Sequence, residues 1–151
     1  MDKKKITLSE YDRAWCNKIL AELLKNPLTL PFRNPVNVER DKAPDYYSII
    51  KKPMSFSVIK KKLIAGEYKS VKEFGNDVNL IAQNAIKYNG ENSMFGYMAQ
   101  DIAIWVDKKI QGKPQNNDEE WRLHLTQVVQ KLRSHIDNAP PSITNPPSPL
   151  P

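Results

Sequence analysis

The sequence predicts an all-α fold: a four-helix bundle with a long loop between its first two helices, plus an additional C-terminal helix. Apolar residues recur at spacings of three and four along five segments, as they do on the buried face of a helix. The 12 prolines are unevenly placed, with none between Pro53 and Pro114, and proline is excluded from helix interiors. Since no segment alternates polar and apolar residues with the period of a strand, strands are not expected.

The first helix is predicted over residues 8–23. Thr7 and Glu10 stand at the spacing of a capping box, in which two side chains satisfy the first backbone N–H groups of a helix. Cys16 lies on the apolar side and is expected to be buried as a small hydrophobic residue. The apolar stripe consists of Leu8, Tyr11, Trp15, Ile19 and Leu23.

The stretch from residue 27 to residue 53 is far longer than the 2–8 residues that usually join the helices of a bundle. It is rich in apolar residues, which would expose a large apolar surface if the segment were disordered. We therefore expect this loop to pack over one end of the bundle and to form the wall of a pocket. The apolar residues are Leu28, Leu30, Phe32, Val36, Tyr46, Tyr47, Ile49 and Ile50.

Three further helices are expected after Pro53. Each follows a serine that can cap a helix N-terminus, namely Ser55, Ser70 or Ser93. Their apolar stripes are Met54, Phe56, Ile59 and Leu63; Phe74, Val78, Ile81, Ala85 and Tyr88; and Phe95, Met98, Ile102, Trp105 and Val106.

A last helix is predicted over residues 117–137, with Asn117 as its cap and Leu125, Val128 and Leu132 in its apolar stripe. That stripe has to be buried either against the bundle or against another protein or a second copy of the chain. The sequence leaves these alternatives open.

Three motifs, in this order and at this spacing, resemble those of a bromodomain: LPFRNPV at 30–36, PDYYSIIKKPMSFSVIKKKL at 44–63 and NAIKYN at 84–89. The resemblance covers roughly residues 8–111. It implies a left-handed four-helix bundle with an acetyl-lysine pocket at one end. It also implies acetylated histone tails or other chromatin proteins as partners, and a nuclear location.

The resemblance also implies roles for individual residues. Asn89 matches the asparagine whose amide donates a hydrogen bond to the acetyl carbonyl, and Tyr46 matches the tyrosine that reaches this carbonyl through water. The residues implied to line the pocket around them are Leu30, Pro31, Phe32, Val36, Tyr88 and Phe95.

Three positions in or near this predicted pocket depart from the pattern of the double-bromodomain chromatin readers, which this sequence otherwise resembles in style. Leu30 stands where those proteins usually have tryptophan, and Asp41 stands where a large apolar residue is common. Phe95, at the entrance, is bulkier than the usual aliphatic residue. We expect a wider groove beside Pro31, a more hydrated wall at Asp41 and a narrower entrance.

The chemistry of such a pocket explains its selectivity. Acetylation turns the lysine ammonium group into a neutral amide, so an apolar cavity with one uncharged amide donor accepts it. Unmodified lysine would bring a charge into the cavity with no carboxylate to pair it, at a cost of several kcal/mol.

Composition limits the other functions. Lys plus Arg is 23 and Asp plus Glu is 17, a net charge of +6, so a lysine-rich surface that contacts DNA phosphates is a hypothesis. The sequence offers no nucleophile with a base, no phosphate-binding loop, no metal-ligand cluster and no apolar stretch of membrane-spanning length. We expect neither an enzyme nor a cofactor, a metal site or a membrane partner.

Two alternatives remain: a degenerate bromodomain that serves only as a protein-interaction scaffold, and a basic helical nucleic-acid-binding domain. The predicted organisation is a basic leader at 1–7, the bromodomain at 8–111, the extra helical segment at 112–138 and a proline-rich, disordered tail at 139–151.

Overall fold

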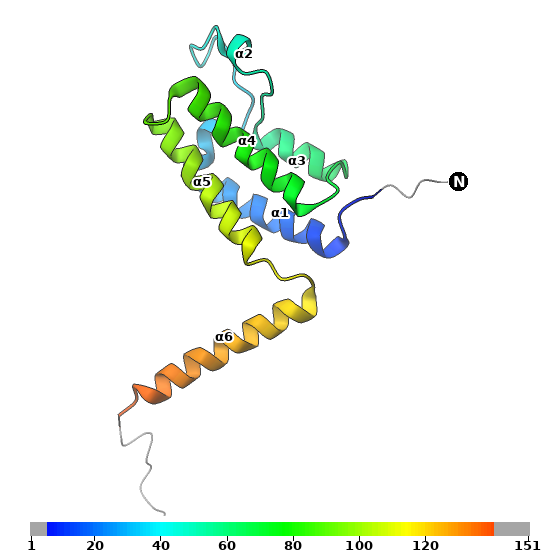
Figure 1. The fold of residues 1–151 in the computed structure, drawn as a ribbon, viewed down its shortest axis with the longest axis vertical. Coiled ribbons are helices and arrows are strands. Elements are labelled where there is room, and N and C mark those ends of the chain that lie inside the picture. The colour runs from blue at the N-terminus through cyan, green and yellow to red at the C-terminus, as the bar shows by residue number, and fades with distance from the viewer. Residues whose placement is uncertain (1–5, 141–151) are drawn as a thin grey trace, which may run out of the picture. The chain divides into compact units, whose positions relative to one another are not determined.

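A computed structural model describes residues 6–140, and all of the regular structure in that range is helical. The prediction of an all-α fold is therefore confirmed. Figure 1 shows α4 and α5 side by side in the bundle, with α2 at one end of it. The elements are α1 Glu10–Lys25, the 3-10 helix η1 Pro27–Phe32, α2 Tyr46–Ile49, α3 Phe56–Ile64, α4 Val71–Asn89, α5 Met94–Gln111 and α6 Asn117–Asp137.

The predicted serine caps of α3, α4 and α5 are confirmed, since Ser55, Ser70 and Ser93 each accept a hydrogen bond from a backbone N–H of the first turn. Two other predicted caps are wrong by one or two residues. Ser9, not Thr7, caps α1 by accepting from the N–H of Asp12 at 3.1 Å. Asn116, not Asn117, caps α6, because its side-chain oxygen reaches the N–H of Glu119 at 2.9 Å.

The core is formed by the facing sides of α1, α3, α4 and α5. Cys16 is buried there, as predicted, with 0% of its surface exposed. The remaining buried residues of this cluster come from the four apolar stripes and the loop before α4, and are Ile19, Leu20, Leu23, Phe56, Ile59, Leu63, Tyr68, Phe74, Val78, Ile81, Ile102 and Val106.

The segment between α1 and α3 is ordered by hydrogen bonds and contains two short helices where the sequence predicts only a loop. Pro27 opens η1 without losing a hydrogen bond, because the first N–H groups of a helix have no partner within it. The buried Thr29 hydroxyl donates to the carbonyl of Leu23 at 2.9 Å, which fixes η1 to the end of α1. α2 ends after one turn, where Ile50 adopts an extended conformation.

The chain divides into two compact units between Lys113 and Pro114. The first unit contains the bundle and the second contains α6, in which no residue is buried. No helix within residues 6–140 has the length and apolar character needed to cross a bilayer. The predicted leader and disordered tail fall largely outside the residues that the structure describes.

Candidate functional site

A cavity of about 460 Å³ opens at the end of the bundle where α4 ends. This volume lies in the range of small-ligand pockets. All eight candidate binding residues line it: Leu30, Pro31, Phe32, Val36, Tyr46, Tyr88, Asn89 and Phe95. The other lining residues are Asn34, Arg40, Asp41, Ala43, Met54, Ile81 and Ala85.

Asn89 is the last residue of α4, and the C-cap position falls on Gly90. Gly90 has φ +95°, in the positive-φ region that glycine adopts most readily, and its N–H bonds to the carbonyl of Ile86 at 2.8 Å. Because Gly90 ends the helix, Asn89 is not needed as the cap. Its side chain makes no hydrogen bond to any other residue in the part of the chain that the structure describes. The Asn89 amide is therefore available to a ligand.

Tyr46 lies at the first position of α2 and is only 8% exposed. Its ring packs edge-on against the ring of Tyr88, with centroids 5.0 Å apart, and against the ring of Tyr47 at 5.3 Å. No buried side-chain polar atom among residues 6–140 lacks a partner, so the Tyr46 hydroxyl, which has no protein partner there, reaches solvent-accessible space. Burial raises the pKa of Tyr46, which keeps this hydroxyl protonated as a donor at neutral pH.

The hydroxyl of Tyr88 donates a hydrogen bond to the carboxylate of Asp45 at 2.8 Å. This bond raises the pKa of Tyr88, because the neighbouring carboxylate disfavours a phenolate. Tyr88 is thus held in one orientation by its ring contact with Tyr46 and by its hydrogen bond to Asp45.

The entrance is formed by residues 30–32, which we call the shelf, and by Phe95 of α5. The ring of Phe32 meets the ring of Phe95 edge to face, with centroids 6.5 Å apart and planes at 80°. Phe95 is 39% exposed, and Leu30 is 60% exposed at the outer end of the shelf. The two rings are in contact on the cavity lining, whereas Leu30 is largely exposed to solvent; the widths of the groove and of the entrance stay predictions.

The wall at Asp41 is polar, as the aspartate at this position leads one to expect. Asp41 pairs with Arg40 at 2.9 Å and accepts a hydrogen bond from the N–H of Asn37 at 2.9 Å. These two interactions hold the pKa of Asp41 below its usual range. The wall therefore carries a charged but internally paired group.

Three residues that support the site are not singled out by the sequence. Asn84 is buried and donates to the carbonyl of Lys52 at 2.8 Å, which connects α4 to the segment before α3. The hydroxyl of Tyr47 donates to the carbonyl of Val36 at 2.6 Å. Arg33 donates to carbonyl groups at the end of α1, including that of Leu24.

One of these residues left a signal in the sequence. Asn84 stands in the apolar stripe of its helix, between Ile81 and Ala85. A polar residue at such a position predicts a buried hydrogen bond, because an unpaired amide there would be costly. Tyr47 lies in the single turn of α2 and Arg33 at the end of η1, elements too short for a periodicity that indicates which way a side chain points.

Comparison with known proteins agrees with the family resemblance of the sequence motifs. A family model described as "Bromodomain" matches residues 16–101. The chain is 33% identical over 107 residues to "Transcription factor GTE1" of Arabidopsis thaliana, which covers 71% of this chain and 25% of that protein. It is 33% identical over 100 residues to "SWR1 complex bromodomain subunit bdf1" of Schizosaccharomyces pombe, covering 66% and 17%.

A third relative is "Bromodomain adjacent to zinc finger domain protein 2B" of Homo sapiens, which is 36% identical over 98 residues, covering 65% of this chain and 4% of that protein. The chain thus spans a quarter or less of the length of these curated relatives. The similarity concerns one module of each of them.

Proposed function

Because this chain belongs to the bromodomain family and is an acetyl-lysine reader module, we propose that Asn89 and Tyr46 are the residues that bind the acetyl group. The Asn89 amide donates to the acetyl carbonyl, and Tyr46 donates to the same oxygen through a water molecule. The shelf, Val36, Tyr88 and Phe95 enclose the methyl group and the lysine methylenes. No catalytic step is part of this proposal.

The observation that carries the proposal is the unpartnered amide of Asn89 on the lining of a cavity that also has apolar walls. An amide donor without charge suits a neutral acyl carbonyl. A lysine ammonium group in the same place would lose its hydration and find no carboxylate in front of it. Asp41, the lining carboxylate, is already paired with Arg40 and with a backbone N–H.

The test is a calorimetric titration of the chain with acetylated and unacetylated forms of one histone-tail peptide. We expect binding of the acetylated form alone, and at least a tenfold loss on Asn89→Ala because the ligand carbonyl is left unpaired. Asn79→Ala, an exposed asparagine of the same helix, is the matched control and should bind like the original chain. Equal binding of both peptides would instead support the scaffold alternative.

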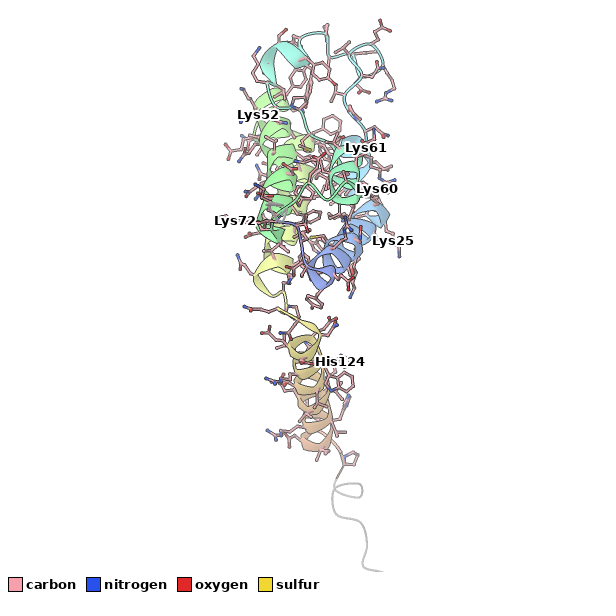
Figure 2. All side chains as sticks on the ribbon, turned by 90° about the vertical axis from the view of Figure 1, so that its right-hand side faces the viewer. Lys25, Lys52, Lys60, Lys61, Lys72 and His124 are labelled. Atoms are coloured by element: carbon pink, nitrogen blue, oxygen red, sulfur yellow. The ribbon has the colours of Figure 1, made fainter. Side chains whose placement is uncertain are left out.

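We further propose a nuclear location and a surface that contacts nucleosomal DNA. Figure 2 labels Lys60 and Lys61 on α3, together with Lys25 of α1 and Lys72 of α4, all within the first unit. All four lysines are exposed.

Contact with phosphates releases counterions, so the affinity for nucleosomes should fall as the salt concentration rises. The double substitution Lys60→Gln and Lys61→Gln should reduce this salt dependence. Affinity that is insensitive to salt contradicts the DNA contact.

The proposed organisation follows the predicted one, with the reader in residues 8–111 and a separate helical segment in 112–138. The partners and complex of the whole protein depend on this reader function and on the surface of α6.

A further inference from the structure

α6 carries an apolar stripe that the reader function does not use. Six large apolar side chains lie along it, each between 46% and 65% exposed. They are Trp121, Leu125, Val128, Val129, Leu132 and Ile136. At 100° per residue they fall within about 100° of the helix circumference, a face of the width that normally packs against another element.

The order of these residues along the helix is symmetric. Their successive spacings are four, three, one, three and four, which read the same from either end. If two such helices run antiparallel about a two-fold axis between positions 128 and 129, every apolar residue meets an apolar residue. Trp121 then lies opposite Ile136, Leu125 opposite Leu132, and Val128 opposite Val129.

The charges of α6 favour the same arrangement. Its first half carries Asp118, Glu119 and Glu120 against a single arginine, and its second half carries Lys131 and Arg133 against a single aspartate. The first half is thus acidic and the second half basic. An antiparallel pair places the net acidic half of one copy beside the net basic half of the other, although this register also brings Glu120 opposite Asp137, whereas a parallel pair would place the two acidic ends together.

We propose that the apolar face of α6 binds the same face of a second copy of this chain, in an antiparallel pair. The interface is isologous, meaning that both copies contribute the same residues, as in most two-fold symmetric dimers. Where the proposed reader function holds, each pair carries two acetyl-lysine cavities, and binding to a doubly acetylated target becomes partly intramolecular.

The test is sedimentation equilibrium of the 151-residue chain over a wide concentration range. We expect a monomer–dimer equilibrium. Leu125→Asp should weaken the dimer at least tenfold, because each substitution places a carboxylate against Leu132 of the other copy. Leu123→Asp is the matched control, since Leu123 is a similarly exposed leucine of the same helix that lies outside the stripe; it should leave the dimer unchanged. Circular dichroism confirms that the variants keep their helix.

A cross-linking experiment tests the register. A mixture of the Leu125→Cys and Leu132→Cys chains should form the mixed disulfide faster than either chain alone, and the native Cys16 stays out of reach because it is fully buried. A preferential link between two copies of position 125 would overturn the antiparallel pair.

Three results would overturn the proposal as a whole: a chain that stays monomeric at every concentration, a dimer that Leu125→Asp leaves intact, or a dimer that Leu123→Asp weakens equally. In a monomeric chain, strong hydrogen-exchange protection along the stripe would assign that face to packing within the chain. These outcomes do not depend on acetyl-lysine binding, so the two proposals fail separately.

Discussion

The hydroxyl of Tyr88 donates a hydrogen bond to the carboxylate of Asp45 at 2.8 Å, across 43 positions of sequence. Asp45 directly precedes Tyr46, and Tyr88 directly precedes Asn89. One hydrogen bond therefore connects the two backbone segments that carry the proposed ligand-binding residues. Together with the ring contact between Tyr46 and Tyr88, it holds these two segments side by side.

Removing this bond should weaken the binding of acetylated peptide without unfolding the bundle. For Tyr88→Phe we expect roughly a fivefold rise in Kd, the size of effect usual for the loss of one hydrogen bond. Calorimetry measures the affinity, and thermal unfolding should change little because the bond is exposed.

Tyr97→Phe is the control for that experiment. The Tyr97 hydroxyl also makes one exposed hydrogen bond, to Asn92 at 3.2 Å, but Tyr97 does not line the cavity. An equal loss of affinity in both variants would contradict a specific role for the bond between Tyr88 and Asp45.

Phe95→Val should change which acyl group the cavity prefers. The Phe95 ring closes the entrance by its edge-to-face contact with Phe32, and valine leaves that side open. We expect weaker binding of acetyl-lysine, because valine buries less apolar surface against the ligand, and a relative gain for longer acyl groups. A competition titration with acetylated and butyrylated forms of one peptide measures the ratio, and an unchanged ratio would show that Phe95 does not limit the size of the ligand.

Much of the bundle and the composition of the cavity follow from the sequence because they depend on periodicity and on local motifs. The four apolar stripes predict the buried faces of α1, α3, α4 and α5, and the length and apolar content of residues 27–53 predict a pocket wall. The resemblance to bromodomain motifs implies the eight candidate residues, and all of them line one cavity. Their individual roles toward a ligand remain predictions.

The short helices and cross-connections between α1 and α3 were not predicted, because they depend on contacts between distant positions. The bond from Tyr47 to the carbonyl of Val36 needs a specific path of irregular backbone. The turn that contains Lys42 was not predicted either. Lys42 has φ +52°, and few non-glycine residues adopt this region of backbone conformation. Composition and spacing carry no information of this kind.

Asn84→Ala should destabilise the bundle and loosen the segment before α3. The substitution removes the hydrogen bond from the buried Asn84 amide to the carbonyl of Lys52, at a cost of about 1 kcal/mol, the usual net value of one hydrogen bond. Urea unfolding measures the free energy, and Asn76→Ala, at an exposed position of the same helix, should change it by less than about 0.5 kcal/mol. Equal effects of the two substitutions would show that the Asn84 amide contributes nothing to stability.

The bundle should lose stability above pH 9, because burial of Cys16 and the nearby Asp12 carboxylate disfavour its thiolate more than Lys113 favours it. Burial raises the pKa of the Cys16 thiol from 9.0 to about 12. Between these values the unfolded chain releases a proton that the folded chain retains, so the free energy of unfolding falls as pH rises, by up to about 1.4 kcal/mol per pH unit. Below pH 9 both states hold the proton and the contribution is fully present.

Cys16→Ala separates this effect from the titration of other groups. The variant should be less stable at pH 7.5, since it leaves a small cavity in the core, but its stability should fall less between pH 9 and pH 10. Tyr68, whose pKa is also raised, chiefly by burial and then by its hydrogen bond to Asp77, adds to the loss at higher pH in both chains. Urea unfolding at pH 7.5, 9 and 10 gives the two slopes, and parallel slopes would mean that the Cys16 thiol does not ionise differently in the folded and unfolded chains.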